Sequence, residues 1–147
     1  MHPKLHAAAG GLALGLIALF WLATLWAETL GGAAAIAPVK RNILFGLALL
    51  VPAVALAGAG GFRLARTRRG PTVERKARRM RLIAGNGLLI LVPSAIFLDQ
   101  RAAAGQIDAA FYAVQLLELA VGAVNITLLA RNMRDGLALR RPVGAGG

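Results

Sequence analysis

Three polar side chains interrupt a long apolar stretch near the C-terminus, and their spacing places them on one side of a helix. Gln115, Glu118 and Asn125 all lie within residues 109–130. Steps of three and four residues follow the 3.6-residue turn of an α-helix, so the three side chains share a face with Phe111. Lipid cannot satisfy an amide or a carboxyl group. This face should therefore contact protein, a ligand or enclosed water.

Glu118 is the strongest candidate for chemistry because it lies near the middle of that stretch. An acidic residue at mid-bilayer costs about 2.5–3.5 kcal/mol on insertion scales. None of the four apolar runs in the chain contains a lysine or an arginine. We therefore expect the carboxyl to be neutral. It either carries protons or only holds a neighbouring helix by a hydrogen bond.

Asn86 is the polar residue expected to meet Asn125. Each lies five or six residues from the basic end of its apolar run, so the two amides should share a depth in the membrane. Helices joined by a short loop are usually neighbours. The sequence predicts an interhelical amide pair, worth roughly 0.5–2 kcal/mol, with a polar ligand between the amides as the alternative.

Four apolar runs must position these residues. They cover residues 7–27, 43–62, 82–98 and 109–130, in a chain that is 58% hydrophobic and 16% charged. A membrane-spanning helix needs about 20 apolar residues. The predicted fold class is an all-α integral membrane protein, a single domain of four transmembrane helices in an up-down-up-down bundle. Residues 29–42 are expected to connect the first two helices.

Small residues recur every four positions in the first two runs. They are Gly11 and Gly15 in the first, and Ala53, Ala57 and Gly61 in the second. Small side chains let helix backbones approach one another, so these positions predict close helix packing.

Basic residues gather on one side of the predicted membrane. Residues 1–6, 63–81 and 131–147 hold 14 of the 17 lysines and arginines. Cytoplasmic loops carry this excess, so both termini are predicted to face the cytoplasm, in the inner (cytoplasmic) membrane of the cell. The basic loop 63–81 and the basic tail would attract anionic lipid headgroups. Glu28 and Asp99 then become polar candidates at the outer face.

A haem site is a weaker hypothesis, raised by His2 and His6 at the start of the first helix. The compact four-helix layout is similar to that of small membrane b-type cytochromes. The similarity covers the layout only, because the helices after the first contain no histidine to complete the usual axial pair. The resemblance would imply a haem b held by His6 with Met80, with another weak ligand, or with a ligand from a second chain.

Signatures of soluble enzymes are missing from the sequence. It contains no cysteine, no Walker loop, no G-x-S-x-G elbow and no H-E-x-x-H pair. We expect a non-enzymatic accessory subunit or a partner- or ligand-binding module, working as a homodimer or in a larger membrane complex. Nucleic acid is not an expected partner, since membrane topology explains the net charge of +11. The alternatives are a small proton-coupled transporter that uses Glu118, and an electron-transfer protein that binds haem or quinone.

Overall fold

The computed structural model describes residues 3–67 and 70–138, except for the side chains at 3–6, 60–67 and 72. Throughout these residues the regular structure is helical, and no strand occurs. The prediction of an all-α protein is therefore confirmed for the described chain.

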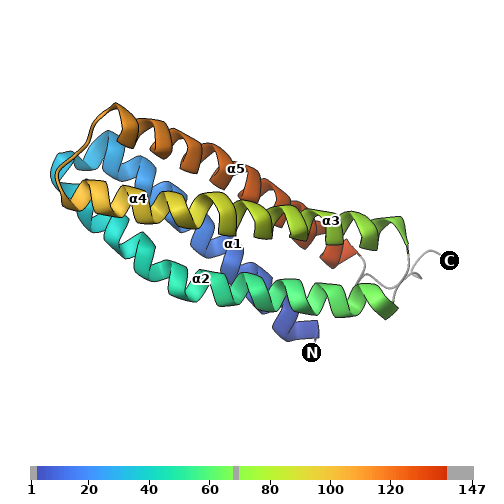
Figure 1. Ribbon diagram of the computed structural model, residues 1–147. Helices are drawn as coiled ribbons and strands as arrows, with labels where there is room; N and C mark the ends of the chain where they lie inside the picture. The colour runs from blue at the N-terminus through green and yellow to red at the C-terminus, as the bar shows by residue number, and fades with distance from the viewer. Residues whose placement is uncertain (1–2, 68–69, 139–147) are drawn as a thin grey trace.

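Four long helical rods make up this structure and lie side by side (Figure 1). A π-helical turn, whose backbone hydrogen bonds span five residues, extends the first rod and interrupts the third. The elements in chain order are α1 (Pro3–Trp26), η1 (Ala27–Gly31), α2 (Ala33–Thr67), α3 (Pro71–Asn86), η2 (Gly87–Leu91), α4 (Val92–Ala103) and α5 (Ala109–Ala138).

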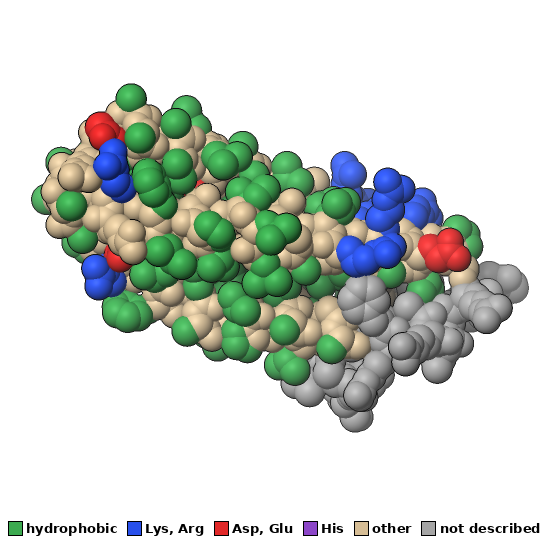
Figure 2. All heavy atoms as spheres, in the orientation of Figure 1, with side chains coloured by type: hydrophobic (Ala, Val, Ile, Leu, Met, Phe, Trp, Pro, Cys, Tyr) green, Lys and Arg blue, Asp and Glu red, His purple; other side chains and the backbone are tan. Residues whose placement is uncertain are grey.

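Each rod contains a stretch that is long and apolar enough to cross a membrane. The stretches are Ala7–Gly31, Ala33–Ala59, Val73–Ala103 and Ala109–Ala138. Figure 2 shows hydrophobic side chains over the middle of the visible face, with Lys and Arg side chains gathered over one end and a few charged groups at the other. This length and surface composition are those of a multi-pass membrane protein.

The turn between the first two rods is much shorter than expected. Gly32 has a φ of 69°, in the left-handed region that favours glycine, and α2 begins directly after it at Ala33. The prediction of a connection over residues 29–42 is therefore wrong. Gly32 reverses the chain alone, and the alanine-rich segment that follows is already helical. α2 continues through Pro38 and Pro52, and Figure 1 shows it changing direction near its middle.

The predicted stripe of small residues marks a packing face in α2, whereas the stripe predicted in α1 does not. Ala53 and Ala57 are only 4% and 3% exposed, while Gly61 lies outside the described side chains. A Cβ placed at Gly11 or Gly15 would meet nothing within 4 Å, so the prediction of close packing at these glycines is wrong. Two positions along a helix correspond to a rotation of about 200°, and the opposite face of α1 is the one that packs. That face carries Ala9, Ala13 and Ile17.

The hydrophobic core consists of two clusters rather than one. The larger joins α1, α2, α3 and α5 and includes Ala13, Leu50, Ile83 and Leu129. The smaller joins α2, α4 and α5, with Ile36, Leu98, Ala102 and Phe111 as its buried members. Four of the buried polar side chains, Thr24, Lys40, Gln115 and Asn125, belong to the candidate site.

Candidate functional site

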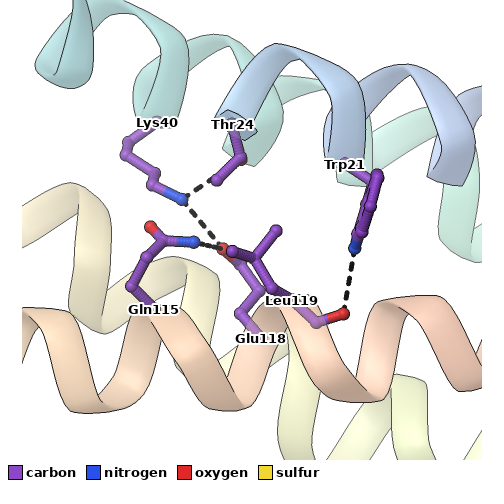
Figure 3. Close-up of polar contacts among 6 residues, drawn as sticks. All are labelled: Trp21, Thr24, Lys40, Gln115, Glu118 and Leu119. Atoms are coloured by element: carbon purple, nitrogen blue, oxygen red, sulfur yellow. Dashed lines mark hydrogen bonds and ion pairs between the residues drawn. The ribbon is translucent and has the colours of Figure 1, made fainter. Parts of the chain in front are cut away.

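A buried ion pair between α2 and α5 lies at the centre of the polar side chains (Figure 3). Lys40 Nζ is 2.8 Å from Glu118 Oε2, and the two side chains are 2% and 14% exposed. Lys40 points inward because it follows the same three-and-four spacing as the buried residues Ile36 and Ile43. Removing two charges from water is costly, so the pair requires close mutual compensation.

The expectation that Glu118 has no cationic partner in this chain is therefore wrong. It assumed that Lys40 lies in a connection, whereas α2 carries Lys40 into the bundle. The argument for a neutral carboxyl depended on that missing charge.

Two further side chains hold the ion pair in position. Lys40 Nζ donates to Thr24 Oγ1 of α1 at 3.3 Å, so three rods meet at this ammonium group. Gln115 lies three residues before Glu118 on α5 and donates its Nε2 to Glu118 Oε2 at 3.3 Å. The oxygen Oε2 thus accepts two hydrogen bonds and is fixed from both sides.

Three oxygen atoms around this ion pair accept no hydrogen bond from the described residues. Gln115 is 2% exposed, yet its Oε1 accepts no hydrogen bond from the described residues. Glu28 of η1 interacts electrostatically with both Lys40 and Glu118, and its buried Oε1 is also unpaired. The hydrogen bonds that Glu118 accepts within the described chain both end on Oε2. Buried acceptors of this kind are costly unless a donor reaches them.

Trp21 joins α1 to the same part of α5. Its indole Nε1 donates to the carbonyl oxygen of Leu119 at 2.9 Å, and Figure 3 shows this hydrogen bond beside the Lys40–Glu118 pair. The ring is also close to the backbone, because a Cβ placed at Gly122 would lie 3.3 Å from Trp21 Cδ1. A glycine at this position therefore gives the indole room to lie between the two helices.

The expected amide pair is present about two helical turns further along the same face of α5. Asn86 Nδ2 donates to Asn125 Oδ1 at 3.0 Å, and Asn125 Nδ2 donates to the carbonyl oxygen of Ile83 at 3.4 Å. Asn125 is 1% exposed. The pair links α5 to the last residue of α3, directly before the π-helical turn η2.

A cavity of about 570 Å³ extends between these polar groups. Side chains from all four rods line it, and almost all of the lining is apolar. Leu47 and Val54 of α2 and Leu88 of η2 are among the apolar residues. The lining residues with polar side-chain atoms are Trp21, Thr24, Arg81, Glu118 and Asn125.

The cavity has an open side where α2 and η2 separate. α2 packs against both α3 and α4, but no backbone contact joins it to η2 among the described residues. Gly87 and Leu91 of η2 line the cavity, while Leu88 and Leu89 are 59% and 78% exposed. Pro93, just after η2, has no backbone N–H to donate. Its missing bond accounts for the altered helical hydrogen bonding at this turn.

The candidate Asp99, and Asp108, which was not a candidate, form ion pairs near the α4–α5 connection. Arg41 Nε lies 2.8 Å from Asp99 Oδ1, and Asp99 is nearly buried. Arg101 pairs with Asp108, which also caps α5 by accepting a 3.1 Å hydrogen bond from the Phe111 backbone N–H. The pKa of Asp108 lies below its usual value of 3.8, first because of the Phe111 N–H and second because of the Arg101 guanidinium.

The residues of the haem hypothesis are only partly described. The side chain of His6 lies outside the described residues. Met80 is 7% exposed, packs in the larger core cluster and lines the cavity. Among the described side chains, no group of three or more His, Cys, Asp or Glu residues is placed to hold a metal ion.

The sequence analysis missed Lys40, Thr24 and Trp21 as members of the site. The signal for Lys40 was its spacing from Ile43. Lys40 lies three residues before Ile43 and so on the same buried face of α2, although it precedes the second apolar run. Thr24 and Glu28 are four residues apart and share a face of the first rod, which was the signal for Thr24. No pattern in the sequence indicates that the Trp21 indole donates to a backbone carbonyl.

Comparison of the chain with family models, with curated proteins and with solved structures finds no match. The geometry of this site therefore carries the functional argument.

Proposed function

We propose that this protein is a small membrane module that takes the apolar part of a lipid-soluble molecule into its cavity. The observation that carries the proposal is the cavity itself, which is apolar over most of its wall and reaches buried polar side chains. Its volume of about 570 Å³ falls within the range of about 300–1,000 Å³ that is typical of small-molecule sites.

The proposed entrance is the gap between α2 and η2. Exposed leucines on η2 border it, and the cavity lining continues from Leu88 to the side chains of α2. At this level of the bundle the surroundings would be acyl chains, not water. The ligand would therefore enter sideways from the bilayer and leave by the same route.

We further propose that the rods run up-down-up-down, with both termini in the cytoplasm and the bundle in the inner membrane. The 14-to-3 distribution of basic residues supports this orientation. The three cations of the sparse side, Lys40, Arg41 and Arg101, each have a carboxylate partner, so that side carries little net charge. Anionic headgroups at the basic end and a second copy or larger complex are the partners we propose.

A proton-coupled transporter is the second candidate. One observation favours it: Glu118 lines the cavity, while its partner Lys40 is also within electrostatic range of Glu28. A carboxyl that can release its counterion to a second carboxyl is able to exchange protons with a transported molecule.

Quenching of Trp21 fluorescence tests the cavity. A Trp26→Phe background leaves Trp21, which lines the cavity, as the single tryptophan. Gly87→Leu adds a side chain to the cavity wall, where a Cβ meets nothing within 4 Å. Gly85→Leu is the matched control, because its Cβ is equally unobstructed and lies outside the lining.

A lipid with a brominated acyl chain, present at low mole fraction, should quench Trp21 by entering the cavity. We expect Gly87→Leu to remove at least about half of this quenching, because the added leucine occupies space in a pocket of ordinary ligand size. Gly85→Leu should behave like the parent. Equal quenching in all three proteins would contradict the proposal.

A further inference from the structure

The polar end of the cavity lacks one positive charge. Lys40 of α2 forms its ion pair with Glu118 of α5, and a second carboxyl group, Glu28 of η1, interacts with that ammonium only electrostatically. α1 contributes only the uncharged Thr24. On α4, Asp99 already has its own partner in Arg41. With both carboxyls ionised, the cluster has a formal charge of −1.

The atoms of this cluster that lack a hydrogen-bond partner are all side-chain oxygens. Glu28 Oε1 and Gln115 Oε1 are both buried and without a donor among the described residues. The hydrogen bonds to Glu118 leave its Oε1 unused. All three atoms are acceptors, and Glu118 is the one of the three residues that lines the cavity, so a ligand head group that meets it there must donate a hydrogen bond.

Only part of this cluster is accessible from the cavity. Glu118 and Thr24 belong to the lining, whereas Glu28 and Gln115 do not. Two aromatic rings, Phe20 and Trp21, line the same cavity, and Figure 3 shows Trp21 bonded to Leu119, the residue after Glu118. Aromatic faces attract cations, most strongly where water is excluded.

We propose that this site binds the ammonium head of a lipid-soluble amine whose chain occupies the cavity. The inference rests on the proposed function, because the cavity must first admit the chain. The ammonium group would donate to Glu118 Oε1 and supply the missing charge. Lys40 is then held by both carboxyls, Glu118 and Glu28, instead of depending on Glu118 alone.

Other head groups fit this chemistry less well. A carboxylate head would add a third negative charge to a cluster with one cation, which is repulsive in a low-dielectric site. A ketone or quinone carbonyl is an acceptor and leaves the unpaired acceptors as they are. An alcohol donates one hydrogen bond but brings no charge.

Three amphiphiles with one common chain test the head group: dodecylamine, dodecanol and dodecanoate. Each is titrated, at matched mole fraction in the bilayer, against the brominated lipid in the Trp26→Phe protein. We expect dodecylamine to displace the quencher about tenfold more effectively than either of the others, as one charge-assisted hydrogen bond would give.

Glu28→Gln should reduce that preference while leaving displacement by dodecanol unchanged, because Glu28 adds charge without lining the cavity. Glu74→Gln, at an exposed acidic residue of α3, is the control. Equal displacement by all three amphiphiles, or equal displacement by the amine and the alcohol, would overturn the ammonium site but leave the apolar cavity standing. Displacement by none of them would mean that the proposed function itself fails.

Discussion

Lys40 and Glu118 are each buried in a position that neither could occupy alone. Lys40 is the more enclosed of the two, and its ammonium group has contacts on two other rods. A buried ion pair adds little net stability, but removing one partner leaves an uncompensated charge in a low-dielectric environment. Single and paired substitutions should therefore behave very differently.

We predict that Lys40→Met lowers the free energy of unfolding by about 3–5 kcal/mol, because it strands the Glu118 carboxylate. The paired change of Lys40→Met with Glu118→Met should recover most of that loss, since it removes both charges at once. Thermal unfolding in detergent measures both variants. A Lys40→Met protein that melts like the parent would show that the pair does not form.

At the scale of single residues, sequence reasoning identified the α5 side of the site and missed the α2 side. The spacing of Gln115, Glu118 and Asn125 was sufficient, because their helix is long and uniformly apolar around them. Lys40 was missed because Pro38 and Arg41 next to it look like the end of a membrane segment. Burial of a lysine depends on a carboxylate far away in the sequence, and local hydropathy does not register such a partner.

The packing of α1 on α2 depends on one glycine that sequence periodicity did not reveal. A Cβ at Gly46 would lie 2.3 Å from Cζ of the Phe20 ring, closer than any real contact. At Gly15, by contrast, the same atom would meet nothing within 4 Å. Gly46 and Gly15 are therefore a matched pair of sites for substitution, one in each helix of the α1–α2 hairpin.

Gly46→Ala should destabilise the protein by about 1–3 kcal/mol because the added methyl group overpacks against Phe20. Gly15→Ala should be neutral or stabilising by up to about 1 kcal/mol, since alanine is the better helix former. The gain in helix propensity is common to both, so the difference in melting temperature reports the clash alone. Equal melting temperatures would place α1 and α2 further apart than described.

The stabilising contribution of Asp108 at the start of α5 depends on pH. Its pKa is lower in the folded protein than the usual 3.8, so the folded state is favoured while the carboxyl is ionised. This contribution is complete near neutral pH, and it disappears as the pH falls through the folded pKa. Asp108→Asn retains an oxygen that can cap the helix but cannot titrate.

We therefore predict that acid lowers the melting temperature less in Asp108→Asn than in the parent below about pH 5. Melting curves collected from neutral pH downward give the comparison. Parallel pH profiles for the two proteins would mean that the cap and the Arg101 contact do not favour the charged form.

For the whole molecule, the sequence predicted the helical class and the number of spanning segments because hydropathy is strong and regular. It did not predict the cavity. Its shape depends on how α2 packs against α3 and α4 while it stays clear of η2. A pattern of apolar residues looks the same whether the space beside it is filled or open.

The proposed orientation is tested by single cysteines, because the chain has none of its own. Ala104→Cys and Glu74→Cys introduce exposed thiols near opposite ends of the bundle. An impermeant thiol reagent applied to intact cells should label position 104, and position 74 only after permeabilisation. The reverse pattern would invert the orientation.

The distance along the chain between the two charges has a consequence for biogenesis. Lys40 and Glu118 are 78 residues apart, so at about 5–20 residues per second the ribosome makes the carboxylate about 4–16 seconds after the lysine. Glu28 is the only acidic residue made before Lys40. We therefore expect it to hold the lysine in the nascent α1–α2 hairpin until α5 arrives. In a chain truncated after Gly105, Glu28→Gln should shorten the half-life in a pulse-chase measurement, whereas an unchanged half-life would show that Lys40 waits without a partner.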